Sequence, residues 1–188
     1  MGDTHIPDRA TSIPHLILKY LSESMPWELV LFTGDLTCEE ILKWLKSIAS
    51  SLHVVKGNMD YLPLPRQATV KYESFQIGLV HGDGVYPRGN PLELSKIAKR
   101  LGVQVLVSGH THADSIRVSP DGSILLLNPG SLTGVWGGGG GNYTPSFMVL
   151  GGFSGECLQV NTYRLRENSL VSSRVVYCFK NNHWIQSL

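Results

Sequence analysis

The sequence predicts an α/β protein whose second half adds a mostly antiparallel sheet. Two observations carry this prediction: short apolar, β-prone runs alternate with amphipathic segments up to about residue 112, and from Ser115 onward β-prone stretches follow one another. The 188 residues are 42% hydrophobic and only 16% charged, so the chain can bury one substantial core. No internal repeat and no charged or proline-rich linker divides it, and we expect a single domain over residues 1–188.

Three helices are predicted from capping residues and from the spacing of apolar side chains. Ser12 begins a helix that runs from about 13 to 24. Thr37 is placed to cap a second helix, and Asn90 begins a third that ends before Gly102. The expected apolar face of the second helix comprises Ile41, Leu42, Leu45, Ile48 and Ala49.

Each apolar run of the first half leads into polar residues. The runs are Leu29–Phe32, Leu52–Val55, Phe75–Val80 and Val103–Val107. Further strands are expected near 115–118 and 123–127, which flank a Pro-Asp-Gly turn, and over about 146–151, 156–165 and 173–179. These later strands suit a second, mostly antiparallel sheet.

The charge balance excludes several classes of partner. The 16 Lys and Arg against 15 Asp and Glu give a formal charge of +1, which leaves no strong signal for nucleic acid or an anionic membrane. The apolar runs are shorter than the ~20 residues that cross a bilayer, so we expect no membrane insertion. The first residues do not resemble a secretory leader, and we expect a cytoplasmic protein.

The sequence has three cysteines and one run of consecutive glycines. Cys38, Cys157 and Cys178 are odd in number and lack Cys-x-x-Cys spacing, so we expect neither a disulfide framework nor a thiolate zinc site. Five consecutive glycines at 137–141 predict a flexible surface loop.

Five polar clusters fall where the apolar strands end. Open α/β sheets bind ligands beyond the carboxyl ends of their strands, so we expect these clusters to meet at one rim. Imidazole and carboxylate ligands suit zinc, manganese or iron, and so many ligands suit two ions that share a carboxylate. The candidate metal ligands are Asp3, His5, Asp35, Asn58, His81, His110 and His112. The other histidines, His15, His53 and His183, lack such a loop context and are expected to be ordinary structural or surface residues.

These clusters, in this order, resemble the metallophosphoesterase superfamily, whose blocks are Asp-x-His, Gly-Asp, Gly-Asn, His and Gly-His-x-His. The likeness is greatest to the small archaeal and bacterial phosphodiesterases and the related retromer subunit of vacuolar protein sorting. It spans about residues 1–180. The further matching segments are 2–9, 77–82, 107–112, 128–131 and 145–147.

The resemblance implies a four-layer α-β-β-α sandwich with two mixed sheets and a centre of two divalent ions. One ion would take Asp3, His5, Asp35 and His112, and the other would take Asp35, Asn58, His81 and His110, so that Asp35 bridges them. Asp35, Asn58 and His110 are the implied catalytic residues, and a metal-bridging hydroxide would attack phosphorus. Manganese is the expected metal, with zinc, iron, nickel and magnesium as alternatives.

Two positions depart from the pattern of the superfamily. Many members have a histidine after the Gly-Asn asparagine that donates a proton to the leaving oxygen, whereas this chain has Met59, which cannot donate one. Asp60 is expected to orient a neighbouring group or a water molecule, and it is a weaker candidate for the missing proton donor. The family also places an apolar strand before Asp3, but only Met1 and Gly2 precede it here, too few to cross a sheet. We therefore expect the first strand to be missing.

Two functions of different classes remain open. The first is a metal-dependent phosphodiesterase acting on a phosphodiester substrate. The second is a retromer-like protein-protein interaction scaffold with a vestigial metal site, whose apolar surface would include residues 62–65, Val85-Tyr86-Pro87 and Trp136. Both a homo-oligomer and retromer-like protein partners are compatible with the sequence.

Overall fold

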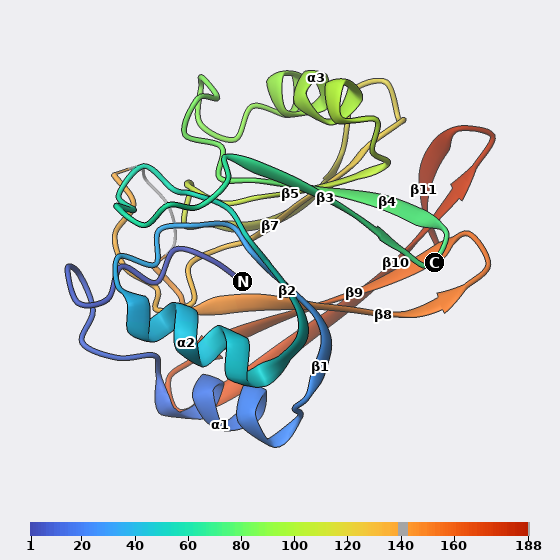
Figure 1. Ribbon diagram of the computed structural model, residues 1–188. Helices are drawn as coiled ribbons and strands as arrows, with labels where there is room; N and C mark the ends of the chain where they lie inside the picture. Colours follow the sequence, from blue (N-terminus) through green and yellow to red (C-terminus); the bar gives the residue numbers. More distant parts are fainter. Residues whose placement is uncertain (139–142, 188) are drawn as a thin grey trace.

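The computed structural model describes residues 1–138 and 143–187, which form four layers (Figure 1). One helix, α3 (Pro91–Leu101), covers the outer face of a five-stranded sheet. A second layer of strands packs on the inner face of this sheet. The helices α1 (His15–Glu23) and α2 (Glu39–Ile48) cover the far side of that second layer. The expected α-β-β-α sandwich is confirmed.

The three predicted helices are present, and two of their ends behave as the sequence indicates. The Asn90 side chain accepts hydrogen bonds from the backbone N–H groups of Leu92 and Glu93, and Gly102 ends α3 in the left-handed conformation at φ 68°. The predicted cap of α2 is wrong: Cys38 occupies the N-cap position. Thr37 instead donates its hydroxyl to the Ile6 carbonyl at 2.7 Å, which ties the loop after β1 to the start of the chain.

The five-stranded sheet has the order β3-β4-β5-β7-β6. Its strands are β3 (Gln67–Tyr72), β4 (Phe75–Val80), β5 (Val105–Ser108), β6 (Asp114–Val118) and β7 (Leu125–Pro129). The central strands β4, β5 and β7 are parallel, and the edge strands β3 and β6 are antiparallel to their neighbours. The prediction that the strands near 115–127 join the second sheet is therefore wrong, because β7 pairs in parallel with β5 and carries β6 with it.

The expected second sheet is divided into two hydrogen-bonded parts. The strands β1 (Trp27–Phe32) and β2 (Ala49–Val54) form a parallel pair. An antiparallel sheet contains β8 (Ser146–Ser154), β9 (Cys157–Arg166), β10 (Ser169–Lys180) and β11 (His183–Ser187). The sequence indicated neither β3 nor β11, and the exposed His183 begins β11.

An apolar slot separates these two parts. It is lined along one side by β1 and along the other by Met148, Val149 and Leu150 of β8, and residues of β4, β5 and β7 also line it. Met1 lies at its end, where the Met1 amino group donates to Leu31 O at 3.0 Å and Met1 O accepts from Thr33 N at 2.9 Å. Within the described residues, β1 pairs only with β2 and β8 only with β9.

Three apolar clusters match the layers. The α1 and α2 side chains pack on Phe32 and Phe147, and the inner faces of the two strand layers meet around Leu79, Leu127 and Val160. The α3 side chains pack on Leu106 and neighbouring residues of the five-stranded sheet. The strands β5 and β7 are buried along their whole length, which explains why they read as continuous apolar runs.

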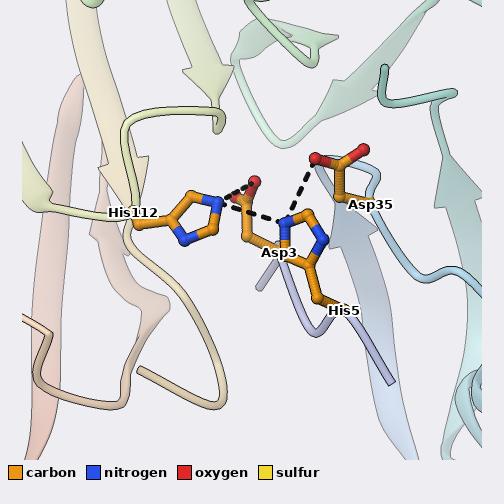
Figure 2. A group of neighbouring side chains, drawn as sticks. All are labelled: Asp3, His5, Asp35 and His112. Atoms are coloured by element: carbon orange, nitrogen blue, oxygen red, sulfur yellow. Dashed lines mark hydrogen bonds and ion pairs between the residues drawn. The ribbon is translucent and has the colours of Figure 1, made fainter. Parts of the chain in front are cut away.

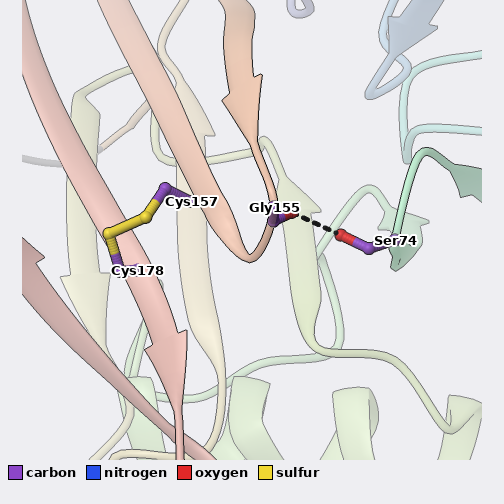
Figure 3. Close-up of a disulfide and its surroundings, with 4 residues drawn as sticks. All are labelled: Ser74, Gly155, Cys157 and Cys178. Atoms are coloured by element: carbon purple, nitrogen blue, oxygen red, sulfur yellow. Dashed lines mark hydrogen bonds between the residues drawn. A yellow bond between two sulfur atoms is a disulfide. The ribbon is translucent and has the colours of Figure 1, made fainter.

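A disulfide corrects the expectation drawn from the cysteines. Cys157 of β9 and Cys178 of β10 are bonded to each other (Figure 3). Cys38 is free and buried. Cys157 and Cys178 stand opposite one another in the register of β9 and β10, with Cα atoms 3.9 Å apart. This juxtaposition depends on strand pairing across 21 residues, which no local cysteine spacing reveals.

Part of the predicted glycine loop lies outside the described residues, which include Gly137 and Gly138 but not 139–142. Gly137 is buried, so at least this position is not a surface loop. Among the described residues, no helix has the length and apolar character needed to cross a bilayer.

Candidate metal centre

The candidate ligands lie in loops at the carboxyl ends of the parallel strands. Asp35 follows β1, Asn58 follows β2, His81 follows β4, and both His110 and His112 follow β5. Asp3 and His5 join the rim because their backbone N–H groups donate to Gly34 O at 2.9 Å and to Asp35 O at 3.0 Å. The structure thus brings all of the predicted ligands to one rim.

The first group contains Asp3, His5, Asp35 and His112, all buried (Figure 2). One potential ligand atom from each of the four lies within 4.8 Å of every other. His5 Nε2 lies 3.2 Å from His112 Nε2 and 3.3 Å from Asp35 Oδ2, and His112 Nε2 lies 3.4 Å from Asp3 Oδ1. Two carboxylates and two imidazoles therefore converge on one point.

The second group gathers on the other side of Asp35. His81 Nε2 lies 3.3 Å from Asp35 Oδ2 and 3.0 Å from Asn58 Oδ1, and the rings of His81 and His110 are 5.0 Å apart. The same oxygen, Asp35 Oδ2, is therefore 3.3 Å from both His5 and His81. The other carboxylate oxygen of Asp35 accepts a hydrogen bond from the backbone N–H of Met59 at 2.8 Å.

The hydrogen bonds of the imidazoles fit a cation. His81 Nδ1 lies 2.8 Å from Thr33 O and His112 Nδ1 lies 2.7 Å from Val135 O, so each Nδ1 carries a proton that it donates to a carbonyl. In the neutral ring each Nε2 then carries a lone pair, and this lone pair faces other hydrogen-bond acceptors. Such an arrangement is satisfied by a bound cation or by a second proton, and a carbonyl on Nδ1 is the usual support of a metal-binding histidine.

Burial and mutual charge shift the pKa values at the centre in opposite directions. Burial raises the pKa of Asp3 to about 6 despite the nearby His81 and His112. Burial also lowers the pKa of His5 and that of His110 to about 4 each. His81 differs: burial works to lower its pKa, but the hydrogen bond and charge of Asp35 and the charge of Asp3 outweigh it and raise the pKa to about 9. The carboxylates of Asp3 and Asp35 thus favour positive charge at His81, between the two groups of candidate ligands.

Five of the seven candidate ligands adopt left-handed backbone angles. The φ values are 53° for Asp3, 48° for His5, 56° for Asp35, 67° for His110 and 58° for His112. This conformation costs a non-glycine residue roughly 1–3 kcal/mol and gathers at functional sites. Two of the adjacent glycines supply space: a Cβ on Gly57 would lie 2.0 Å from Asp35 Oδ1, and one on Gly109 would lie 2.6 Å from Asp3 Oδ2. Gly34 and Gly82 have positive φ values of 98° and 99°.

Asp60 orients its neighbours by accepting hydrogen bonds from two loops of the site. Its Oδ2 accepts from the backbone N–H groups of Asp35 at 2.8 Å and Gly57 at 2.9 Å, and its Oδ1 accepts from Thr37 N at 3.0 Å. The carboxylate is 5% exposed. Since both oxygens serve these loops, Asp60 is not placed as a substitute proton donor.

Asn128 and Ser131 also support the loops of the site, a role that their sequence context does not indicate. Asn128 donates to Gly109 O at 2.9 Å, and the Ser131 hydroxyl donates to Asp3 O at 2.7 Å. Both hydrogen bonds span distant parts of the chain, and both hold the backbone of a loop that carries candidate ligands.

A family model for the calcineurin-like phosphoesterase superfamily domain matches residues 1–150, which include every candidate ligand. The chain belongs to this superfamily. It is 47% identical over 133 residues to a protein of Methanocaldococcus jannaschii named "Probable metallophosphoesterase", and 44% identical over 136 residues to one of the same name from Methanothermobacter thermautotrophicus. These matches cover 71% of this chain in both cases, and 66% and 75% of the two relatives.

Solved structures of Vps29 share the fold. A single-residue mutant of Vps29 from Entamoeba histolytica has a TM-score of 0.86 and 34% identity over 94% of this chain and 96% of that one. The wild-type protein in complex with Zn²⁺ has a TM-score of 0.83, with 34% identity over 93% and 96% of the two chains. Vps29 of Chaetomium thermophilum bound to a cyclic peptide has a TM-score of 0.78, with 29% identity over 95% and 94%. The expected relationship to the vacuolar-sorting protein is confirmed.

Proposed function

We propose that this superfamily member is a phosphodiesterase with two divalent ions. Asp3, His5, Asp35 and His112 would hold one ion, and Asp35, with Asn58, His81 and His110, would hold the other. The observation that carries the proposal is the position of Asp35 Oδ2, which is 3.3 Å from both His5 Nε2 and His81 Nε2. A carboxylate oxygen between two imidazole groups is suited to bridge two cations.

When bound, such ions stabilise charge on a phosphoryl oxygen and lower the pKa of water toward neutrality. The chain's own residues fit this chemistry. Asn58 is exposed at the rim, where its amide N–H₂ is a donor for a phosphate oxygen. Burial, together with the charges of His81 and Arg88, keeps the pKa of His110 near 4, so its ring is neutral at pH 7 and suited to bind a cation.

Leaving-group chemistry limits the substrates. Met59 stands beside the site, 41% exposed, and its thioether cannot donate a proton. Because Asp60 is committed to backbone N–H groups, neither residue supplies a general acid. We therefore expect faster cleavage of diesters whose leaving group is already acidic.

The direct test compares metal-free protein with protein loaded with Mn²⁺ or Mg²⁺ on an activated aryl phosphodiester. Metal-free protein should be inactive, and Mn²⁺ should restore turnover more readily than Mg²⁺ because histidine ligands favour it. Phosphomonoesters are assayed in parallel to establish whether diesters are preferred. Equal turnover with chelator and with Mn²⁺, in protein verified to be metal-free, would disprove the mechanism.

The bridging role has its own test. Asp35→Ala should lose metal and activity together, whereas His53→Ala, which changes a histidine outside the site, should lose neither. Metal analysis and circular dichroism on both variants separate ligand loss from unfolding. Full occupancy by two ions in a folded Asp35→Ala protein would show that Asp35 is not the bridge.

A retromer-like scaffold is the second candidate, favoured by the likeness to Vps29 in complex with a cyclic peptide. The surface expected for it is only partly present: Tyr86 and Trp136 are 86% and 59% exposed, but Leu62 and Val85 are core residues at 6% and 4%. No turnover by protein with both ions bound would favour this scaffold over the enzyme.

A further inference from the structure

Three consecutive carbonyls at the rim of the metal centre each accept a hydrogen bond from a different side chain. Val135 O accepts from His112 Nδ1 at 2.7 Å, Trp136 O accepts from Arg9 Nη1 at 2.8 Å, and Gly137 O accepts from Arg88 Nη1. This segment has no regular secondary structure. Side chains from three distant parts of the sequence therefore fix its position.

The same segment is packed directly on a candidate ligand. A Cβ on Gly137 would lie 2.6 Å from Cγ of His112, so only glycine allows the backbone this close to the imidazole. Arg9 is tied to the ligands as well, because its backbone N–H donates to His5 O at 2.8 Å. The residue between Val135 and Gly137 is thus held at a defined position beside the first group of ligands.

That residue is Trp136, and its indole faces solvent. The side chain is 59% exposed, and the Arg9 guanidinium lies over the ring at 5.8 Å from its centroid. Tryptophan side chains are on average highly buried, so an indole this exposed is unusual for a residue that only anchors a loop. Here the backbone is anchored by three hydrogen bonds while the indole, with Arg9 over one face, remains more than half exposed, as suits contact with a ligand.

We propose that Trp136 stacks on the base of a nucleotide whose phosphate binds at the metal centre, with Arg9 and Arg88 adding positive charge around that phosphate. The inference deepens the proposed function and rests on it. Aromatic side chains stack on any base, and a guanidinium retains further N–H donors after it has bonded one carbonyl. A protein contact would favour a broad apolar patch, but the burial of Leu62 and Val85 removes two members of the predicted patch.

The test measures binding, independent of turnover, by calorimetry with Mn²⁺-loaded protein. The probes are adenosine 5′-monophosphate and ribose 5-phosphate, which share the phosphate and sugar and differ in the base. The nucleotide should bind about ten-fold more tightly, the order expected for one stacked base. Trp136→Leu should abolish this difference and leave the affinity for ribose 5-phosphate unchanged. Trp136→Phe should retain most of it, and Trp44→Leu, which changes a helix α2 residue, should retain all of it.

The possible outcomes distinguish a failure of base stacking by Trp136 from a failure of the proposed phosphate site. Metal-dependent binding of both probes with equal affinity would overturn the stacking role and keep the phosphate site. A difference that survives in Trp136→Leu would also overturn the role. Binding of neither probe by protein with both ions bound would overturn the phosphate site and the stacking role together.

Discussion

Asp60 Oδ2 accepts a hydrogen bond of 2.8 Å from the backbone N–H of Asp35, the residue placed between the two groups of candidate ligands. Through Gly57 and Thr37 the same carboxylate also joins the loops that follow β1 and β2. A buried side chain without a ligand role thus fixes the position of the central ligand.

Removal of this carboxylate should cost both stability and metal affinity. Asp60→Ala leaves three buried N–H groups without their acceptor, and each such group costs about 1–3 kcal/mol. We expect the free energy of unfolding, measured by urea denaturation, to fall by about 3 kcal/mol or more. Asp8→Ala, which changes an exposed carboxylate, is the control. A variant at position 60 as stable as this control would refute the role.

The meeting of the candidate ligands at one rim was predictable from sequence, whereas the hydrogen bonds that hold their loops were not. An apolar run that ends in Gly-Asp or His-Gly is a local pattern, and the rule that parallel strands share one carboxyl edge then brings Asp35 and His81 together. Asp60 stood in the same cluster as Asn58, yet its role depends on N–H groups from two separate loops. Tertiary structure alone brings those groups together.

The errors about the fold have the same origin. Periodicity identified strands β6 and β7 but could not assign them to a sheet, because their partners lie far along the chain. The disulfide between Cys157 and Cys178 follows from the register of β9 and β10, which the alternation of apolar residues does not fix. By contrast, the Asn90 cap and the Gly102 end of α3 depend only on neighbouring residues, and both are confirmed.

Chelation should destabilise the protein. If the proposed site holds metal, its removal leaves Asp3 and Asp35 buried beside each other with their charge uncompensated by a cation. At an ion concentration one hundred times the dissociation constant, an ion that binds only the folded state adds about 2.7 kcal/mol to the free energy of unfolding. We expect the thermal midpoint to fall on chelation and to recover on addition of Mn²⁺. An unchanged midpoint, in protein shown by metal analysis to have lost its ions, would contradict the site.

The slot between β1 and β8 is expected to accept an engineered strand that is joined to Met1 and runs parallel to β1. Burial lowers the pKa of the Met1 amine to about 5, so a charged amino group is disfavoured where a peptide bond would be neutral. An extension of about five apolar β-branched residues before Met1 would span most of β1. It should raise the thermal midpoint by at least about 5 °C.

A Gly/Ser extension of the same length controls for the added chain and the lost amino charge. It offers backbone hydrogen bonds but no side chains to fill the slot. If both extensions shift the midpoint equally, the slot does not select an apolar strand.

The last prediction concerns the leaving group. Met59 is 41% exposed, and its backbone N–H donates to Asp35 Oδ1 at 2.8 Å, which fixes the residue beside the centre. Met59→His should place an imidazole where a proton can reach a leaving oxygen. General acid catalysis contributes ~10²–10⁴-fold when geometry and pKa are suitable, and a grafted histidine should achieve part of this with poorly acidic alcohols.

Activated aryl esters should gain much less, because their leaving groups need little protonation. The informative quantity is therefore the slope of log kcat/KM against leaving-group pKa, measured over a series of diesters at matched metal occupancy. A flatter slope in Met59→His than in the parent protein would identify position 59 as the place of a general acid. Met59→Gln, whose amide is a far weaker acid than an imidazolium, should keep the parent slope. Parallel lines for all three proteins would mean that a side chain at position 59 does not reach the leaving oxygen.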